Sequence, residues 1–210
     1  GLIACTVHCM NPTPPSEVRD VRDRILSSGQ RIMGGKGFSA VGLNEVLSAA
    51  GVPKGSFYHY FGSKEAIGEA LLDDYFAAYL ADMDRIFTTS GSNRAQQLDA
   101  YFSAWKENQS FEDCQGKCLA VKLGAEVADL SQGMRAVLQR GTAGIIARLA
   151  RVLEAGAAEG SLAFTGTPGA VAQSLYELWL GASLMVKIVR SSQPFDNAAQ
   201  ATRQMLHPAA

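Results

Sequence analysis

The chain has 210 residues, of which 47% are hydrophobic and 19% are charged, so it can bury a sizeable core and is neither disordered nor a coiled-coil rod. Nineteen basic against twenty acidic residues give a net charge of −1, which gives no overall sign of a nucleic-acid partner. Four cysteines and three histidines are too few for a disulfide scaffold or a histidine-rich zinc site. The longest well-filled apolar run, residues 178–186, is about half a membrane span, so we expect a cytoplasmic protein with no membrane segment.

Residues 1–15 carry no charge and contain three prolines, which predicts an N-terminal tail. From residue 16 onward, apolar residues recur at the 3.6-residue helical period, and no stretch alternates at period two. The fold class is therefore predicted to be all-α, with Ser63 and Thr167 as helix N-caps. The predicted helices cover residues 16–33, 43–50, 53–60, 64–87, 94–111, 117–128, 132–158, 168–190 and 195–206.

The charge is distributed unevenly along the chain. Residues 16–64 contain seven basic and four acidic residues, giving +3, whereas residues 65–210 contain twelve basic and sixteen acidic residues, giving −4. A small basic module on a larger acidic body is typical of a DNA-binding protein with a separate sensing domain, although such a split also arises by chance. We predict a DNA-binding domain at 16–64 and a ligand-binding and dimerisation domain at 65–210.

Residues 43–61 have the pattern of a helix–turn–helix motif. The first helix ends at Gly51, and a second, short helix follows Pro53. Phe57 and Phe61 lie one turn apart on this second helix and are expected to face the core. Its outward face then suits the DNA major groove, because it offers an ammonium, hydroxyls, an imidazole and a glycine from Lys54, Gly55, Ser56, Tyr58 and His59.

Two further features beside this helix suit DNA phosphate. The hydroxyls of Tyr58 and Tyr60 need partners that core packing does not supply and that phosphate oxygens would supply. Ser63 and Lys64 open the next helix, whose free N–H groups and positive dipole end form an anion site. An ordinary capped helix start explains Ser63 and Lys64 equally well.

The stretch from Lys36 to Ile67 contains the motif Gly51-Val-Pro-Lys-Gly-Ser-Phe-Tyr-His-Tyr-Phe-Gly-Ser-Lys-Glu65. This stretch resembles the DNA-binding domain of the TetR family of bacterial transcriptional regulators. The resemblance implies a homodimer in which each subunit joins a three-helix DNA-binding head to a helical body that binds an inducer. Transferred position by position, it implies DNA contacts by Lys54, Gly55, Tyr58, His59 and Lys64.

Two positions depart from the pattern of this family. Its members usually open the second helix with Thr-Thr or Thr-Ser, which cap the helix and contact phosphate, whereas this chain has Val41 and Gly42 there. The residues that usually supply the side-chain cap and one phosphate contact are therefore missing at this helix start. Ser39 is the candidate that could replace them in the phosphate contact, and the backbone of Gly42 is a second candidate contact.

The body resembles a narrower group of the family, the NemR-type repressors of electrophile-detoxifying reductases, and the residues 53–61 are shared with AcuR-type regulators. This resemblance implies electrophile sensing by a cysteine in the neighbourhood of Cys114 and Cys118. Alignment on Cys118 places Asn108, rather than Cys114, near the sensing cysteine. A buried structural role is the alternative for both thiols.

Other residues of the body are candidates for an inducer pocket. Lys187 lies on an otherwise apolar helix, where a buried ammonium needs an anionic ligand or a carboxylate unless its stem reaches water near the helix end. Aromatic side chains at helical spacing form either pocket walls or plain core. The candidates are Tyr101, Phe102, Trp105, Tyr176 and Trp179.

The last two predicted helices combine large apolar residues with small ones that allow close helix approach. The family resemblance implies that they form a four-helix dimer interface, and packing within one chain is the alternative. The candidate interface residues are Leu175, Leu178, Gly181, Ala182 and Met185.

The sequence carries no convincing signal for catalysis, a metal or a cofactor. Residues 29–36 nearly form a phosphate loop, but Gln30 and Gly37 stand where a glycine and a Ser or Thr belong. We predict a homodimeric repressor, not an enzyme, that a small-molecule or reactive-electrophile inducer releases from a palindromic operator on double-stranded DNA. The alternative is a helical small-molecule or thiol-redox binding protein without DNA-binding function.

Overall fold

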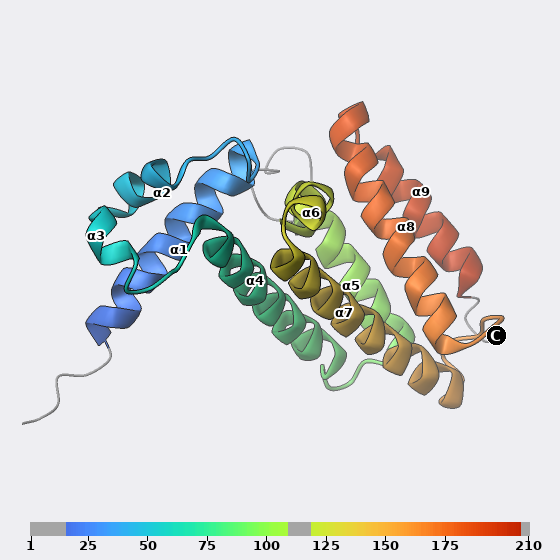
Figure 1. Cartoon of the computed structure of the whole chain (residues 1–210). Helices are drawn as coiled ribbons and strands as arrows, with labels where there is room; N and C mark the ends of the chain where they lie inside the picture. Colours follow the sequence, from blue (N-terminus) through green and yellow to red (C-terminus); the bar gives the residue numbers. More distant parts are fainter. Residues whose placement is uncertain (1–15, 109–118, 207–210) are drawn as a thin grey trace, which may run out of the picture.

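The structure is a computed structural model that describes residues 16–108 and 119–206, and the described chain is built from helices joined by short turns (Figure 1). The all-α prediction is therefore confirmed. In chain order the helices are α1 (Ser16–Lys36), α2 (Leu43–Ala50), α3 (Lys54–Phe57), α4 (Lys64–Phe87), α5 (Arg94–Asn108), α6 (Leu119–Leu130), α7 (Gln132–Ala158), α8 (Pro168–Val189) and α9 (Gln193–Met205).

The predicted helix starts are largely confirmed by their caps. Ser63 Oγ accepts a hydrogen bond from the N–H of Ala66 at 3.1 Å, and Thr167 Oγ1 accepts one from Ala170 at 3.3 Å. Helix α2 begins after Gly42 without a side-chain cap, so Ser39 does not replace the usual capping residue. These starts were predictable because a cap is decided by neighbouring residues.

The predicted length of the third helix is wrong. It was expected over residues 53–60, but α3 has four residues and ends at Phe57. The chain then continues as a turn, in which His59 N–H donates to the Ser56 carbonyl at 3.1 Å and Tyr60 N–H donates to the Phe57 carbonyl at 2.8 Å. These two bonds span three residues, whereas Phe61 N–H donates to the Phe57 carbonyl four residues back at 3.0 Å, so the segment is a mixed turn and not a regular α-helix.

Helices α1, α2, α3 and the start of α4 form the head, at one end of the molecule (Figure 1). Every helix of the head contributes a fully buried side chain to its core: Ile25, Met33, Val46, Phe57 and Ile67. Burying each such side chain contributes roughly 1.5–3 kcal/mol before entropy is subtracted. Phe57 and Phe61 stack with their ring centroids 6.1 Å apart, which confirms their inward orientation.

The body consists of the rest of α4 and helices α5 to α9, with α7 packed against both α4 and α8. Where α4 meets α7, the ring of Phe76 lies against Gly141, and a Cβ on Gly141 would be 2.2 Å from Phe76 Cγ. Only glycine permits this close approach. Helix α4 thus belongs to both domains, since Ile67 lies in the head core and Phe76 in the body core.

A carboxylate of the body holds the loop that leads into the helix–turn–helix. Glu126 of α6 accepts hydrogen bonds from the backbone N–H groups of Phe38 at 3.0 Å and Ser39 at 2.7 Å. Lys64 Nζ lies 4.3 Å from the centroid of the Phe38 ring, so a positive charge faces the same loop. Hydrogen bonding from Ser39 lowers the pKa of Glu126, and the charge of Lys64 lowers it further. At neutral pH Glu126 is therefore an ionised acceptor.

Replacing this carboxylate by an amide, Glu126→Gln, is expected to lower the Tm at neutral pH, because an uncharged oxygen accepts the two N–H groups less strongly. Since the folded-state pKa of Glu126 is lowered, its stabilisation is present above the unfolded-state pKa and is lost as the pH falls through the folded-state pKa. Thermal unfolding should therefore show a Tm difference that shrinks once the pH falls below about 4.

The control is Asp129→Asn, which removes an exposed carboxylate from the same helix and should leave the Tm unchanged. A Glu126→Gln protein with the Tm of the parent chain at neutral pH, or with a deficit that does not change with pH, would contradict this role of the carboxylate.

Candidate DNA-binding face and ligand cavity

The turn between α2 and α3 is closed by a left-handed glycine. Gly51 has a φ of 65°, and the following N–H, that of Val52, donates to the Leu47 carbonyl at 3.0 Å. A residue with a Cβ is strained in this conformation, whereas glycine adopts it readily. Pro53 then forms the N-cap of α3. Helices α2 and α3 are therefore connected as the helix–turn–helix pattern predicted.

Helix α3 and the turn after it present a polar surface to solvent. Phe57 is fully buried and fixes which side of the segment faces the core. Ser56 and Tyr60 are half-buried beside it, and Tyr58 is 58% exposed. The exposed residues of this surface are Lys54, Gly55, Tyr58 and His59. The predicted DNA contacts of this segment thus lie on or beside one accessible surface.

The remaining predicted DNA contacts flank this surface. Ser39 and Gly42 are exposed just before α2, and a Cβ on Gly42 would meet nothing within 4 Å, so a partner has room to approach the backbone there. Lys64 is half-buried, and its ammonium contacts the ring of Phe38. The assignment of these residues as DNA contacts stays a prediction. Glu126, which positions Ser39, escaped the sequence analysis because 87 residues separate the two.

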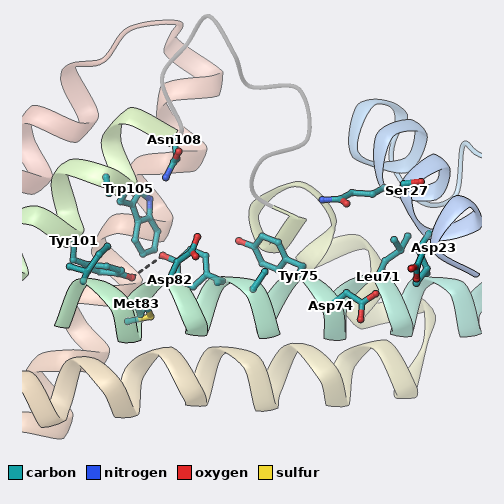
Figure 2. A pocket seen from close by; sticks show the side chains of 16 residues that line it. Asp23, Ser27, Leu71, Asp74, Tyr75, Asp82, Met83, Tyr101, Trp105 and Asn108 are labelled. Atoms are coloured by element: carbon teal, nitrogen blue, oxygen red, sulfur yellow. Dashed lines mark hydrogen bonds between the residues drawn. The ribbon is translucent and has the colours of Figure 1, made fainter. Parts of the chain in front are cut away.

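A cavity of about 510 Å³ lies between α1, α4 and α5 (Figure 2). Its volume is in the range of pockets that hold drug-sized ligands. Helix α1 contributes Asp23, Ser27 and Gln30, and α5 contributes Trp105 and Asn108 at the other end. Since α1 belongs to the head and α5 to the body, this cavity is bounded by both domains.

The cavity has an aromatic floor and an acidic rim. Tyr101 and Trp105 are buried, and the hydroxyls of Tyr79 and Tyr101 form a hydrogen bond of 2.9 Å. Burial raises the pKa of Tyr101 well above its usual value, so its hydroxyl stays neutral. Three exposed carboxylates form the rim: Asp23, Asp74 and Asp82.

Two of the five candidate aromatic residues, Tyr101 and Trp105, line this cavity. Trp105 Nε1–H donates to Ser183 Oγ at 2.9 Å, which fixes the indole between α5 and α8. Trp179 Nε1–H donates to Thr202 Oγ1 at 2.9 Å and so joins α8 to α9. The other three candidates are buried in the core behind Trp105, which is the alternative that the sequence analysis gave for these aromatic residues. They are Phe102, Tyr176 and Trp179.

The other candidate sensing residues lie elsewhere. Lys187 is half-buried in the last turn of α8 and is not among the residues that line the cavity. Its place near the helix end fits the alternative in which the stem reaches water. Cys114 and Cys118 lie outside the described residues.

Helix α8 exposes an apolar stripe near its C-terminal end, formed by Leu184, Met185, Ile188 and Val189. Gly181 lies one turn earlier and is exposed, with open space where a Cβ would be. Leu178 is half-buried. The structure places two of the predicted interface residues, Leu175 and Ala182, in the core of the chain instead, with 0% and 7% exposure.

Within residues 16–108 and 119–206, no three or more His, Cys, Asp or Glu side chains lie together in a way that could hold a metal ion. Among the helices of the same residues, none combines the length and apolar character that a membrane span requires.

Two family models match the chain, and each corresponds to one of the structural units. A model described as bacterial regulatory proteins, tetR family, matches residues 25–71, which contain the helix–turn–helix. A model described as the tetracyclin repressor-like C-terminal domain matches residues 95–202, which form most of the body.

Individual relatives agree with these models. The chain is 42% identical over 179 residues to the HTH-type transcriptional repressor NemR of Escherichia coli K12, covering 85% of this chain and 90% of that protein. It is 31% identical over 170 residues to the transcriptional regulator AcuR of Cereibacter sphaeroides, covering 81% and 78%.

The crystal structure of the reduced form of E. coli NemR matches the fold with a TM-score of 0.86 at 41% identity, over 91% of this chain and 99% of that one. The exposed helix–turn–helix, the helical body and these matches agree over nearly the whole described chain. The chain therefore belongs to the TetR family of bacterial transcriptional regulators.

Proposed function

We propose that this regulator is a repressor that binds its DNA operator through the exposed surface of α3. The observation that carries the proposal is the pairing of a buried anchor, Phe57, with an exposed cation, Lys54, on one short helix at the surface of the head. Gly55 allows the backbone to approach the groove closely, and Tyr58 offers a hydroxyl to phosphate. Similarity to a named repressor, NemR, supports repression as the direction of control.

The repressor acts as a homodimer on a palindromic operator. The apolar stripe of α8 would be covered if a second copy presented the same stripe across a two-fold axis. Large exposed apolar side chains that lie together on one helix are typical of such an interface. The two heads of the dimer would then enter successive major grooves, about 34–36 Å apart.

The inducer is a small molecule that binds in the cavity between α1, α4 and α5. Because the cavity is bounded by both head and body, its shape depends on how the two are oriented. A ligand that binds the DNA-incompatible orientation more tightly lowers operator affinity, by at most its own difference in binding free energy between the two orientations. An electrophile that reacts with Cys114 or Cys118 is the second candidate, drawn from the NemR-type resemblance.

Replacement of the exposed cation, Lys54→Ala, is expected to weaken operator binding about tenfold and to reduce the salt slope by about one unit, because one ammonium no longer contacts the DNA. Fluorescence anisotropy with labelled operator at several salt concentrations measures both quantities. Lys122→Ala, which removes an exposed lysine from the body, is the matched control and should bind as the parent chain does.

A parent chain that shows no steep salt dependence and no preference for the palindromic site would refute the repressor proposal. That result would favour the alternative, a helical small-molecule or thiol-redox binding protein without DNA-binding function. An equal loss of operator affinity in Lys54→Ala and Lys122→Ala would show that the total positive charge of the protein, and not the surface of α3, determines operator affinity.

A charge placed in the apolar stripe, Ile188→Glu, is expected to convert the dimer to monomers at micromolar concentration, since burying an unpaired carboxylate in an interface is costly. Sedimentation velocity measures the change. The control is Leu130→Glu, which alters an exposed apolar residue outside the stripe, at the end of α6, and should leave the dimer intact. A dimeric Ile188→Glu protein, or a parent chain that sediments as a monomer, would contradict this interface.

A further inference from the structure

We propose that the cavity between α1, α4 and α5 selects aromatic or apolar ligands that carry a positive charge. The inference rests on the proposed function only where it takes the cavity to be the inducer site. The chemistry of the ligand follows from the charge of the rim and the nature of the floor.

The charges that line the cavity are of one sign. Asp23 comes from α1, and Asp74 and Asp82 come from α4, two turns apart on the same helix. Among the described residues that line the cavity there is no lysine, arginine or histidine. A cavity with three carboxylates at its rim concentrates cations and repels anions, because its walls focus the field of the rim.

The arginines nearest to these carboxylates do not line the cavity. Arg22 Nη1 lies 3.9 Å from Asp23 and 3.8 Å from Asp74, which is longer than a hydrogen bond. Arg85 pairs with Asp82 along α4, where both side chains are exposed. Exposed ion pairs of this kind contribute little net free energy, so a ligand cation can compete for the carboxylates.

The floor complements an apolar or aromatic ligand. The rings of Tyr79 and Trp105 are nearly perpendicular at 85°, with their centroids 6.3 Å apart, and Tyr101 meets Trp105 at 89° and 5.9 Å. Met83 lies beneath them, fully buried. Such a set offers both ring faces and ring edges, and ring faces attract cations as well as apolar groups.

The arrangement in space matches a ligand with two unlike ends. Figure 2 shows Tyr101 and Trp105 at one end of the cavity and Asp23 at the other, with Tyr75 and Asp82 between them along α4. An aromatic group at the floor would therefore leave a positive charge within reach of the rim. Asp23 of α1 and Asp74 of α4 lie close enough to share Arg22, so a ligand charge beside them would interact with the head and the body together.

The test compares two probes of nearly the same shape and opposite charge, tetraphenylphosphonium and tetraphenylborate, by isothermal titration calorimetry on the full-length protein. The phosphonium is expected to bind at least about tenfold more tightly than the borate, because three rim carboxylates attract one and repel the other. Asp82→Asn should weaken phosphonium binding about fivefold and strengthen borate binding.

Two further variants define the place of binding. Asp99→Asn removes an exposed carboxylate of α5 that does not line the cavity, and it should leave both affinities unchanged. Ala78→Trp places an indole in the cavity from an exposed position on α4 and should abolish phosphonium binding. Circular dichroism of each variant confirms that the helices are intact.

Equal affinity for the two probes, no effect of Asp82→Asn, or no binding of the phosphonium at all would overturn the proposed selectivity. Operator binding is measured separately on the same preparations. If the ligand-free protein binds operator but not the phosphonium, the ligand class is wrong and the repressor proposal stands. If it binds the phosphonium but never the operator, the repressor proposal is wrong and the ligand class stands.

Discussion

The side-chain carboxylate of Glu126 links the DNA-binding head to the body. Glu126 lies on α6, which packs on α7 in the body, yet its two oxygens accept the N–H groups of consecutive residues in the loop before α2. Two adjacent hydrogen bonds to an ionised acceptor restrict rotation as well as distance. Lys64, at the start of α4, brings its positive charge to the same loop from the other side. Head and body are therefore joined by a polar contact in addition to the continuous helix α4.

The head and the body also meet at the cavity, which residues of both line. Helix α1 contributes Ile25 and Met33 to the head core while Ser27 and Gln30 line the cavity. A ligand that changes the spacing of α1 and α4 would thus move the head against a body that still holds the loop through Glu126. Ligand binding in the cavity can change operator affinity if α1 moves with the ligand and if the ligand binds two head orientations with different affinity.

The parts of the structure that the sequence predicted depend on neighbouring residues. The caps at Ser63 and Thr167, the glycine turn at Gly51 and the inward Phe57 all follow from local spacing and local hydrogen bonds. The predicted length of α3 was wrong because the residues after Phe57 form a turn with both three-residue and four-residue hydrogen bonds, and the residue pattern does not distinguish such a turn from an α-helix.

The cavity and the Glu126 contact could not be predicted because they join residues that are far apart in the chain. Tyr101 and Trp105 were candidate pocket residues, but nothing local distinguished Trp105, at the cavity, from Trp179, in the core behind it. The acidic rim is likewise complete only when α1, with Asp23, lies beside α4, with Asp74 and Asp82. For α8, the family resemblance gave Leu175 and Ala182 as interface candidates, whereas the packing of α8 against α7 and α9 buries both of them within the chain.

The central claim is that the Glu126 contact holds the head against the body, and the homodimer proposed above offers a way to test it. Pulsed electron paramagnetic resonance between spin labels at exposed Ser48 on α2, one in each protomer, tests it most directly. Introducing the label as a noncanonical amino acid leaves the four cysteines in place. The account predicts a narrow distance distribution in the parent chain and a clearly broader one in Glu126→Ala, with helix content unchanged. Distributions of equal width and position in the two proteins would contradict it.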